Sequence, residues 1–257
     1  MKIKYSGLTD KGSVRQANED SILLNEIIVN YEDHFEMTEV ADKELTAEAM
    51  WLAVADGMGG HEAGEVASRI TLEKLKDTFI DKGSELLNNG DKLKEVIGRI
   101  HAEVNLYGES AGNKGMGTTL VGSIFNLEKF LLYNVGDSRV YILRNGYLQQ
   151  KTRDHSLKEQ ANIEAAKNII VSSIGGGKDD IIIDIYDLSG QVKAGDLMLI
   201  CSDGLTDIDL EANYDEFESI VADNVDDLPA MCKKLLLYSL DKGSSDNISI
   251  IAALFGE

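Results

Sequence analysis

Hydrophobic and polar positions alternate with two different periods in the first half of the chain. Residues 2–9 alternate between apolar and polar side chains, and residues 20–29 and 49–56 are short apolar runs, so each segment predicts a strand. Residues 61–80 and 91–110 carry apolar side chains every three or four positions, which is typical of amphipathic helices. The pattern predicts strands followed by a pair of helices.

The second half returns mainly to short apolar runs. One helix is expected at 226–240, and Asn145-Gly146 predicts a tight hairpin turn. Further strands are expected at 117–126, 129–138, 139–152, 180–188, 196–204 and 246–255. About ten strands with three or four helices, dominated by hairpins, predict an antiparallel α+β fold with two packed sheets and helices outside.

Composition narrows the kind of protein. The 25 Lys and Arg residues against 45 Asp and Glu give a net charge of −20, which argues against nucleic acid and anionic membranes as partners. No apolar run approaches the roughly 18 residues of a membrane span, and the first residues lack an apolar signal core, so we expect a cytoplasmic protein. Cys201 and Cys232 lie in apolar surroundings and are expected to be buried free thiols. Without a Pro- or Ser-rich linker, residues 1–257 are expected to form one domain.

Acidic residues stand at the ends of several predicted strands. Glu19 and Asp20 begin one strand, Asp56 and Asp203 each end one, and Asp246 begins the last. An acid beside a buried strand is costly unless it is paired or binds a cation. If these strands are neighbours in one sheet, their acids meet at one rim. Oxygen ligands without Cys or clustered His suit Mg²⁺ or Mn²⁺ better than Zn²⁺.

In the stretch VADGMGGHEAG, several glycines follow Asp56, and a bound metal ion would account for them. Gly57 can offer its carbonyl to a metal held by Asp56 because it has no side chain in the way, and Gly59 and Gly60 let the turn enter a helix. An Asp-Gly turn with a helix cap is the simpler explanation of this motif taken alone. The metal interpretation depends on the other acids.

Seven ordered motifs resemble those of metal-dependent protein phosphatases of the protein phosphatase 2C type, especially the bacterial branch. They are TDKGSVRQANEDS, VADGMGGHEAGEVAS, GMGTTLVGSIF, NVGDSRVYILRNGYL, RDHS, LMLICSDGLTD and DNISIIAALF, and the resemblance runs from about Ser6 to Phe255. It implies a four-layer α-β-β-α sandwich of two antiparallel sheets flanked by helices. It also implies hydrolysis of phosphoserine and phosphothreonine in proteins by a water or hydroxide that bridges two Mn²⁺ or Mg²⁺ ions.

The resemblance assigns the two core metal ions to particular residues. Asp56 would bridge them, and Asp203 and Asp246 would complete one of the two sites. Glu19 and the carbonyl of Gly57 would belong to the other site.

Two further acids and one arginine complete the implied set. Asp20 would orient metal-bound water, and Asp137 would help Asp203 to hold a weaker third ion. Arg15 matches the arginine that grips the substrate phosphate, which a guanidinium can do bidentately. A surface ion pair with Glu19 or Asp20 is the simpler role for this arginine.

The four histidines differ in what they imply. His61 is the candidate general acid for the leaving seryl or threonyl oxygen, with helix capping or a hydrogen bond to a carboxylate as the alternative. His155 is expected to be structural. His34 and His101 are expected to lie in a loop and on a helix surface.

The chain departs from the family pattern in two places. The flap at about 154–174 is shorter than usual, which affects substrate choice, and residues 25–48 form a candidate surface insertion. We expect phosphoprotein substrates of a Ser/Thr kinase and take a monomer as the default. Two alternatives remain open: a phosphatase-like binding module without turnover, and a hydrolase for small phosphate esters. A lost metal ligand would favour the binding module, but none is missing.

Overall fold

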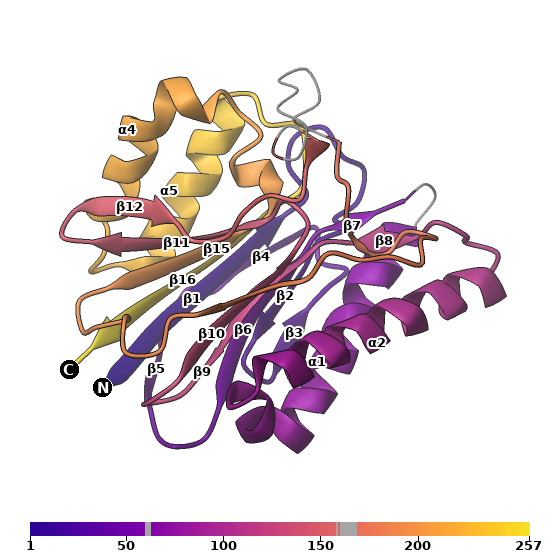
Figure 1. Cartoon of the computed structure of the whole chain (residues 1–257). Coiled ribbons are helices and arrows are strands. Elements are labelled where there is room, and N and C mark those ends of the chain that lie inside the picture. Colours follow the sequence, from indigo (N-terminus) through magenta and orange to yellow (C-terminus); the bar gives the residue numbers. More distant parts are fainter. Residues whose placement is uncertain (60–62, 158, 160–168) are drawn as a thin grey trace.

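Four layers stack in the order helices, sheet, sheet, helices in the computed structural model, which describes residues 1–59, 63–157, 159 and 169–257 (Figure 1). Helices α1 (Ala63–Leu87) and α2 (Gly90–Ser110) cover one sheet, and α4 (Leu210–Ala222) and α5 (Leu228–Asp241) cover the other. This α-β-β-α sandwich confirms the α+β prediction.

Both large sheets are antiparallel throughout their paired strands. The first sheet has the order β12-β11-β15-β16-β1-β4, with β5 also paired to β1. Its strands are β1 (Lys2–Asp10), β4 (His34–Glu36), β5 (Ala41–Glu44), β11 (Arg139–Arg144), β12 (Tyr147–Gln150), β15 (Leu197–Cys201) and β16 (Ile248–Gly256).

The second sheet has the order β14-β10-β9-β6-β2-β3. Its strands are β2 (Ser21–Leu24), β3 (Ile27–Val29), β6 (Met50–Ala55), β9 (Leu120–Phe125), β10 (Phe130–Val135) and β14 (Asp184–Asp187). A small third sheet joins β13 (Ile174–Gly175), β8 (Gly117–Thr118) and β7 (Gly57–Met58).

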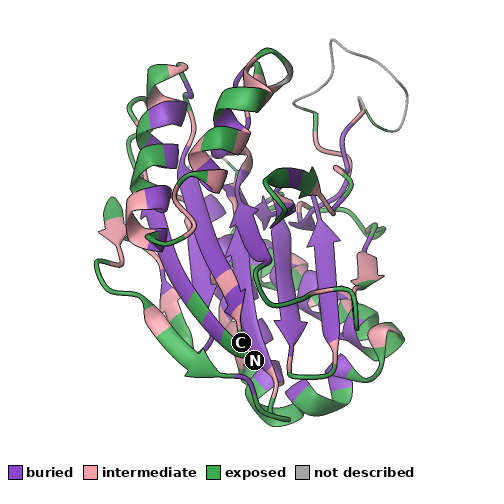
Figure 2. Cartoon of the chain, turned by 90° about the vertical axis from the view of Figure 1, so that its left-hand side faces the viewer, coloured by how far each residue is buried: buried purple, intermediate pink, exposed green. Residues whose placement is uncertain are grey.

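Strand β6 shows how a continuous apolar run serves two layers. All six of its residues are buried. Alternate side chains of a strand point to opposite faces, so Trp51, Ala53 and Ala55 pack against the helical layer, whereas Leu52 and Val54 pack between the two sheets. The central strands are therefore apolar on both faces, as the buried sheets in Figure 2 show.

The first and last strands lie side by side near the middle of the first sheet. β1 pairs with β16 over its whole length, from Lys2 opposite Gly256 to Asp10 opposite Ile248. The two ends of the chain are therefore neighbours (Figure 2). No described helix is long and apolar enough to cross a membrane.

Several elements differ from the sequence prediction. Residues 20–29 form the hairpin β2–β3 rather than one strand, because Asn25 takes a left-handed backbone with a φ of 58° that asparagine tolerates. Only 184–187 of the strand expected at 180–188 is extended and paired. Helix α4 was not predicted. The hairpin at Asn145-Gly146 is confirmed, with φ values of 54° and 84°. Cys201 and Cys232 are buried free thiols, as expected.

Candidate active site

The acids at the strand ends come from both large sheets, so the condition that their strands are neighbours in one sheet is not met. Glu19 and Asp20 precede β2 and Asp56 follows β6, all in the second sheet. Asp203 follows β15 and Asp246 precedes β16, both in the first sheet. The sheets pack face to face, and the corresponding strand ends meet between them. The acids still converge, through the sandwich rather than along one rim.

The raised pKa values of these carboxyls reflect their burial and the negative charges of their neighbours. Burial raises the pKa of Asp56 well above its ordinary range, and the negative charges of Asp20, Asp203, Asp246 and Asp137 raise it further. Burial, reinforced by Asp246, raises the pKa of Asp203 to about 6. Asp203 also shares a hydrogen bond with Asp56. Such a cluster is unfavourable in the absence of counter-charge.

Three of the buried carboxyls have an oxygen atom without a hydrogen-bond partner in the described part of the chain. These atoms are Oδ1 of Asp20, Asp137 and Asp203. Buried acceptors are normally paired, so unpaired carboxylate oxygens in a cluster of acids fit a hard divalent cation that takes oxygen ligands.

The described residues nevertheless contain no group of three or more His, Cys, Asp or Glu side chains already spaced for a metal ion. An ion pair joins Arg15 Nη2 to Asp246 Oδ2, and the two atoms are 2.6 Å apart. Arg15 therefore contacts Asp246, a predicted metal ligand, rather than Glu19 or Asp20. The Arg15 side chain is 50% exposed and has room to move.

Two serine hydroxyls hold Asp20 in place. Ser202 Oγ and Ser249 Oγ donate to Asp20 Oδ2 at 2.9 and 2.7 Å. Asn18 and Thr9 extend this network behind Ser249. Burial raises the pKa of Asp20 to about 7 although both hydroxyls lower it. Because the hydroxyls occupy Oδ2, the unpaired Oδ1 is the atom left for a ligand.

Two threonines fix the turn that carries Asp56. Thr119 accepts from the Asp56 backbone N–H through its Oγ1 at 3.0 Å and donates its own N–H to the Asp56 carbonyl at 2.8 Å. Thr118 Oγ1 donates to the same carbonyl at 2.8 Å. Gly57 then pairs with Thr118 in the small sheet. The turn that carries Asp56 is thus hydrogen-bonded to the end of β8 and to Thr119, the residue that follows it.

Two glycines let this turn and helix α1 approach Glu19. A Cβ atom on Gly57 would lie 2.5 Å from the Glu19 carbonyl oxygen. A Cβ atom on Gly64 would lie 2.8 Å both from Glu19 Oε2 and from the Gly57 carbonyl carbon. The Glu19 carboxyl and the Gly57 carbonyl group therefore lie beside the same point of α1.

Asp137 follows β10 in a turn that His155 supports. His155 Nδ1 accepts from the backbone N–H of Gly136 at 3.1 Å, and the His155 N–H donates to the Gly136 carbonyl at 2.8 Å. His155 Nε2 donates to Asp184 Oδ2 at 3.1 Å. The structural role expected for His155 is confirmed. Burial raises the pKa of Asp137 and the charge of Asp203 raises it further, so these two carboxyls are close.

Of the other histidines, His34 and His101 do not join this cluster in the described part of the chain. His61 lies outside the described residues, as does Gly60, so their expected roles stay predictions. His34 is exposed but begins strand β4, so its expected place in a loop is wrong, and its Nδ1 lies 2.6 Å from Asp10 Oδ2. His101 is buried, so its expected place on a helix surface is wrong. Its Nδ1 accepts from the Gly175 N–H at 3.1 Å and its Nε2 donates to the Lys178 carbonyl at 3.0 Å.

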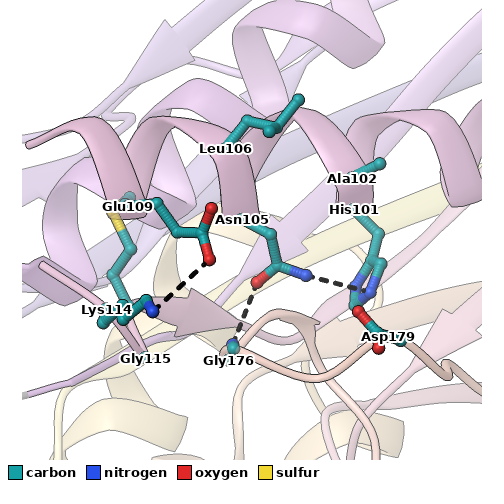
Figure 3. Close-up of a pocket in the computed structure, with 12 residues that line it drawn as sticks. His101, Ala102, Asn105, Leu106, Glu109, Lys114, Gly115, Gly176 and Asp179 are labelled. Carbon is teal, nitrogen blue, oxygen red and sulfur yellow. Dashed lines mark hydrogen bonds and ion pairs between the residues drawn. The ribbon is translucent and has the colours of Figure 1, made fainter.

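A separate hollow of about 640 Å³ lies between α2 and the turns at 112–116 and 176–179 (Figure 3). Its polar groups are already engaged: Asn105 accepts from Gly177 N–H at 2.9 Å and donates to the Lys178 carbonyl at 2.8 Å, and Lys114 faces Glu109 at 3.7 Å. None of the proposed metal ligands lines it. It does not present converging free groups of the kind that the acid cluster has.

Several residues that shape the site were not singled out from the sequence. They are Gly64, Thr118, Thr119, Ser202, Asn247 and Ser249, together with Ser68, whose Oγ donates to the Glu19 carbonyl at 2.7 Å. A signal for some of them was present, since Ser202 and Ser249 interrupt apolar strands close to acids, where a buried hydroxyl needs a partner.

Comparison with known proteins agrees with this geometry. Residues 39–229 match the model of the family described as protein phosphatase 2C. The serine/threonine phosphatase stp of Listeria innocua is 32% identical over 258 residues, which cover 95% of this chain and 92% of that protein. The chain therefore belongs to the protein phosphatase 2C family.

Solved structures support the same relationship. The serine/threonine phosphatase of S. agalactiae superposes with a TM-score of 0.79 at 28% identity, covering 99% of this chain and 100% of that one. The catalytic domain of the serine threonine protein phosphatase PstP, solved in complex with two manganese ions, gives a TM-score of 0.71 at 28% identity and covers both chains fully.

Proposed function

We propose that this chain is a metal-dependent phosphatase that hydrolyses phosphoserine and phosphothreonine in proteins. The observation that carries the proposal is the cluster of buried carboxyls, drawn from both sheets, which raise one another's pKa and of which three keep an oxygen without a hydrogen-bond partner in the described part of the chain. Its membership of the protein phosphatase 2C family supports the same activity, as do the serine/threonine phosphatases that it resembles along nearly its whole length.

The donor set fits two Mn²⁺ or Mg²⁺ ions, and the manganese-bound relative supports these metals. Asp56 would contact both ions, with Asp203 and Asp246 completing one site, and with Glu19 and the Gly57 carbonyl in the other. When bound, such ions supply positive charge that offsets the carboxylates. They also lower the pKa of water, so that it can lose a proton near neutral pH and attack phosphorus.

The remaining residues act on water and on the substrate. Asp20, held by its two serine hydroxyls, orients a water molecule through Oδ1. Arg15 leaves Asp246 and donates to the non-bridging phosphate oxygens, where it stabilises the charge that develops during displacement. His61 is proposed to protonate the leaving oxygen, and Asp137 to help hold a weaker third ion.

Asparagine substitutions test the metal assignment. Asp203→Asn and Asp246→Asn should each lower kcat/KM for a phosphopeptide with Mn²⁺ by roughly 100-fold or more, since a ligand and a charge are lost together. Asp187→Asn, on an exposed position of β14, is the control and should leave activity unchanged. Unchanged activity in the Asp203 and Asp246 variants would refute the assignment.

Substrate class is tested by comparing several phosphopeptides with metabolite phosphates under the same conditions. Faster turnover of the phosphopeptides supports the proposal, whereas faster turnover of the metabolites would identify a small phosphate-ester hydrolase. Normal Mn²⁺ binding without turnover of any substrate would identify a binding module.

We further propose that residues 1–257 act as one phosphatase domain, as a monomer, in signalling opposite a Ser/Thr kinase. A cytoplasmic location is supported by the two free thiols, which suit a reducing compartment. Gel filtration and the cell fraction in which the protein is found would test these points. Much of the proposed flap lies outside the described residues, so its effect on substrate choice stays a proposal.

A further inference from the structure

One buried amide beside the site joins three points of the segment before β2. Asn247 is 4% exposed and directly follows Asp246. Its Oδ1 accepts from the Glu19 backbone N–H at 2.9 Å. Its Nδ2 donates to the carbonyls of Lys11 at 2.9 Å and Ala17 at 3.0 Å. Both amide hydrogens and the amide oxygen of Asn247 are therefore engaged with the chain on either side of Arg15.

The segment that this amide holds carries two residues of the proposed site. Arg15 lies between the two carbonyls that Asn247 contacts, and Glu19 is anchored through its own N–H. The segment also packs tightly on the strand start, because Gly12 has a φ of 74° and a Cβ there would overlap the Asp246 carbonyl oxygen. The segment that carries Arg15 is thus held by the residues at the start of β16, next to Asp246.

We propose that Asn247 is a positioning residue that sets Arg15 and Glu19 relative to Asp246. This inference rests on the proposed phosphatase function and goes beyond it, because Asn247 is neither a metal ligand nor a phosphate contact. The position requires a group that donates twice and accepts once. A carboxylate cannot donate, and it would add a negative charge to a cluster already crowded with carboxyls.

The consequence of losing the amide follows from what it holds. A loose 11–17 loop places Arg15 in the phosphate-binding position for a smaller fraction of the time, so the apparent substrate affinity falls by that fraction. A loose Glu19 weakens one metal site. The chemical step in a molecule with both metal and substrate bound is less affected, since the same groups are then present.

The experiment compares Asn247→Ala and Asn247→Asp with the parent protein. Asn247→Ala should raise KM for a phosphopeptide and the half-saturating Mn²⁺ concentration about tenfold, with kcat at saturation falling less than threefold. Asn247→Asp keeps the acceptor for Glu19 but loses both donations, so it should raise KM. A folded Asn247→Ala protein with KM and Mn²⁺ requirement within twofold of the parent would overturn the proposal, as would a loss confined to kcat.

A matched control separates positioning from general support of the fold. Asn126 makes a comparable set of bonds in the β9–β10 turn, donating to Ala47 O at 2.9 Å and accepting from Glu128 N and Lys129 N at 2.9 and 2.8 Å. This turn lies at the opposite end of the second sheet from Asp56. Asn126→Ala should lower the unfolding temperature but leave KM, kcat and the Mn²⁺ requirement unchanged.

A measurement without metal or substrate makes the test independent of turnover. Hydrogen exchange of the Glu19 amide in metal-free protein should be faster in Asn247→Ala and stay slow in Asn247→Asp, which retains the acceptor. Trypsin should cleave after Arg15 faster in both variants. An inactive parent protein would count against the proposed function, whereas an active parent whose Asn247 variants match it in exchange, cleavage and kinetics would count against this inference alone.

Discussion

Replacing Asp203 with asparagine should make the metal-free protein more stable at alkaline pH, although the same change should lower kcat/KM by roughly 100-fold or more. The Asp203 carboxyl is buried beside Asp246 and Asp56, and its pKa is raised from 3.8 to about 6. A raised pKa means that the folded state prefers the protonated carboxyl. Ionisation therefore opposes folding, and an amide of the same shape removes that opposition.

The magnitude follows from the size of the shift. One pKa unit corresponds to about 1.4 kcal/mol, so a shift from 3.8 to about 6 corresponds to roughly 3 kcal/mol in the free energy of unfolding. The stabilising contribution of the protonated group is complete below pH 3.8 and is lost as the pH rises through about 6. At about 2–4 °C per kcal/mol, Asp203→Asn should raise the unfolding temperature by roughly 6–12 °C at pH 8.

The assay is urea denaturation of parent and variant in EDTA, at intervals from pH 8 down to pH 4. The stability difference should shrink as the pH falls, and added Mn²⁺ should stabilise the parent but not the variant. Asp196→Asn is the control of opposite sign, because Arg144 holds the pKa of Asp196 below its ordinary value. An Asp203→Asn protein that is less stable than the parent at pH 8 without metal would refute the argument from carboxylate repulsion.

Three further changes probe other parts of the site. Arg15→Ala should raise KM for phosphopeptides about tenfold without raising the half-saturating Mn²⁺ concentration, because the ion pair with a metal ligand is also lost; a higher Mn²⁺ requirement would contradict this. Gly64→Ala should raise the Mn²⁺ requirement in a titration, because its Cβ would press on the Glu19 carboxyl, and an unchanged requirement would exclude that contact. Ser249→Ala should move the acidic limb of the pH–rate profile to higher pH, because Asp20 loses a hydroxyl that lowers its pKa; a shift toward lower pH would oppose it.

Much of the fold was predictable because its layers follow simple periodicities. The helices at α1, α2 and α5 repeat their apolar residues at helical spacing, and the hairpin at Asn145-Gly146 has the turn chemistry that fixes it. Helix α4 was missed because charged and apolar residues are mixed along it. Its helical structure is stabilised by packing against β12 and α5. Tyr214 of this helix donates to the carbonyl of Leu148 in β12 at 2.6 Å.

The acids of the site were predictable for a different reason. Carboxyls at the ends of apolar strands are conspicuous, whereas the sheet to which each strand belongs depends on long-range pairing that no local pattern encodes. The same limit applies to Asn247 and Thr119. Each looks like an ordinary polar residue in its own stretch of sequence, and only the fold shows that its partners lie far away along the chain.

The central place of β16 in the first sheet has a consequence for biosynthesis. This strand lies between β15 and β1, and the residues just before it supply both Asp246 and the amide that holds Glu19. On a ribosome, the segments around residues 19 and 56 emerge long before the segment that must lie between β15 and β1. A nascent chain that has not yet inserted this strand therefore lacks both Asp246 and the Asn247 amide at the site, and we expect it to be inactive until that step.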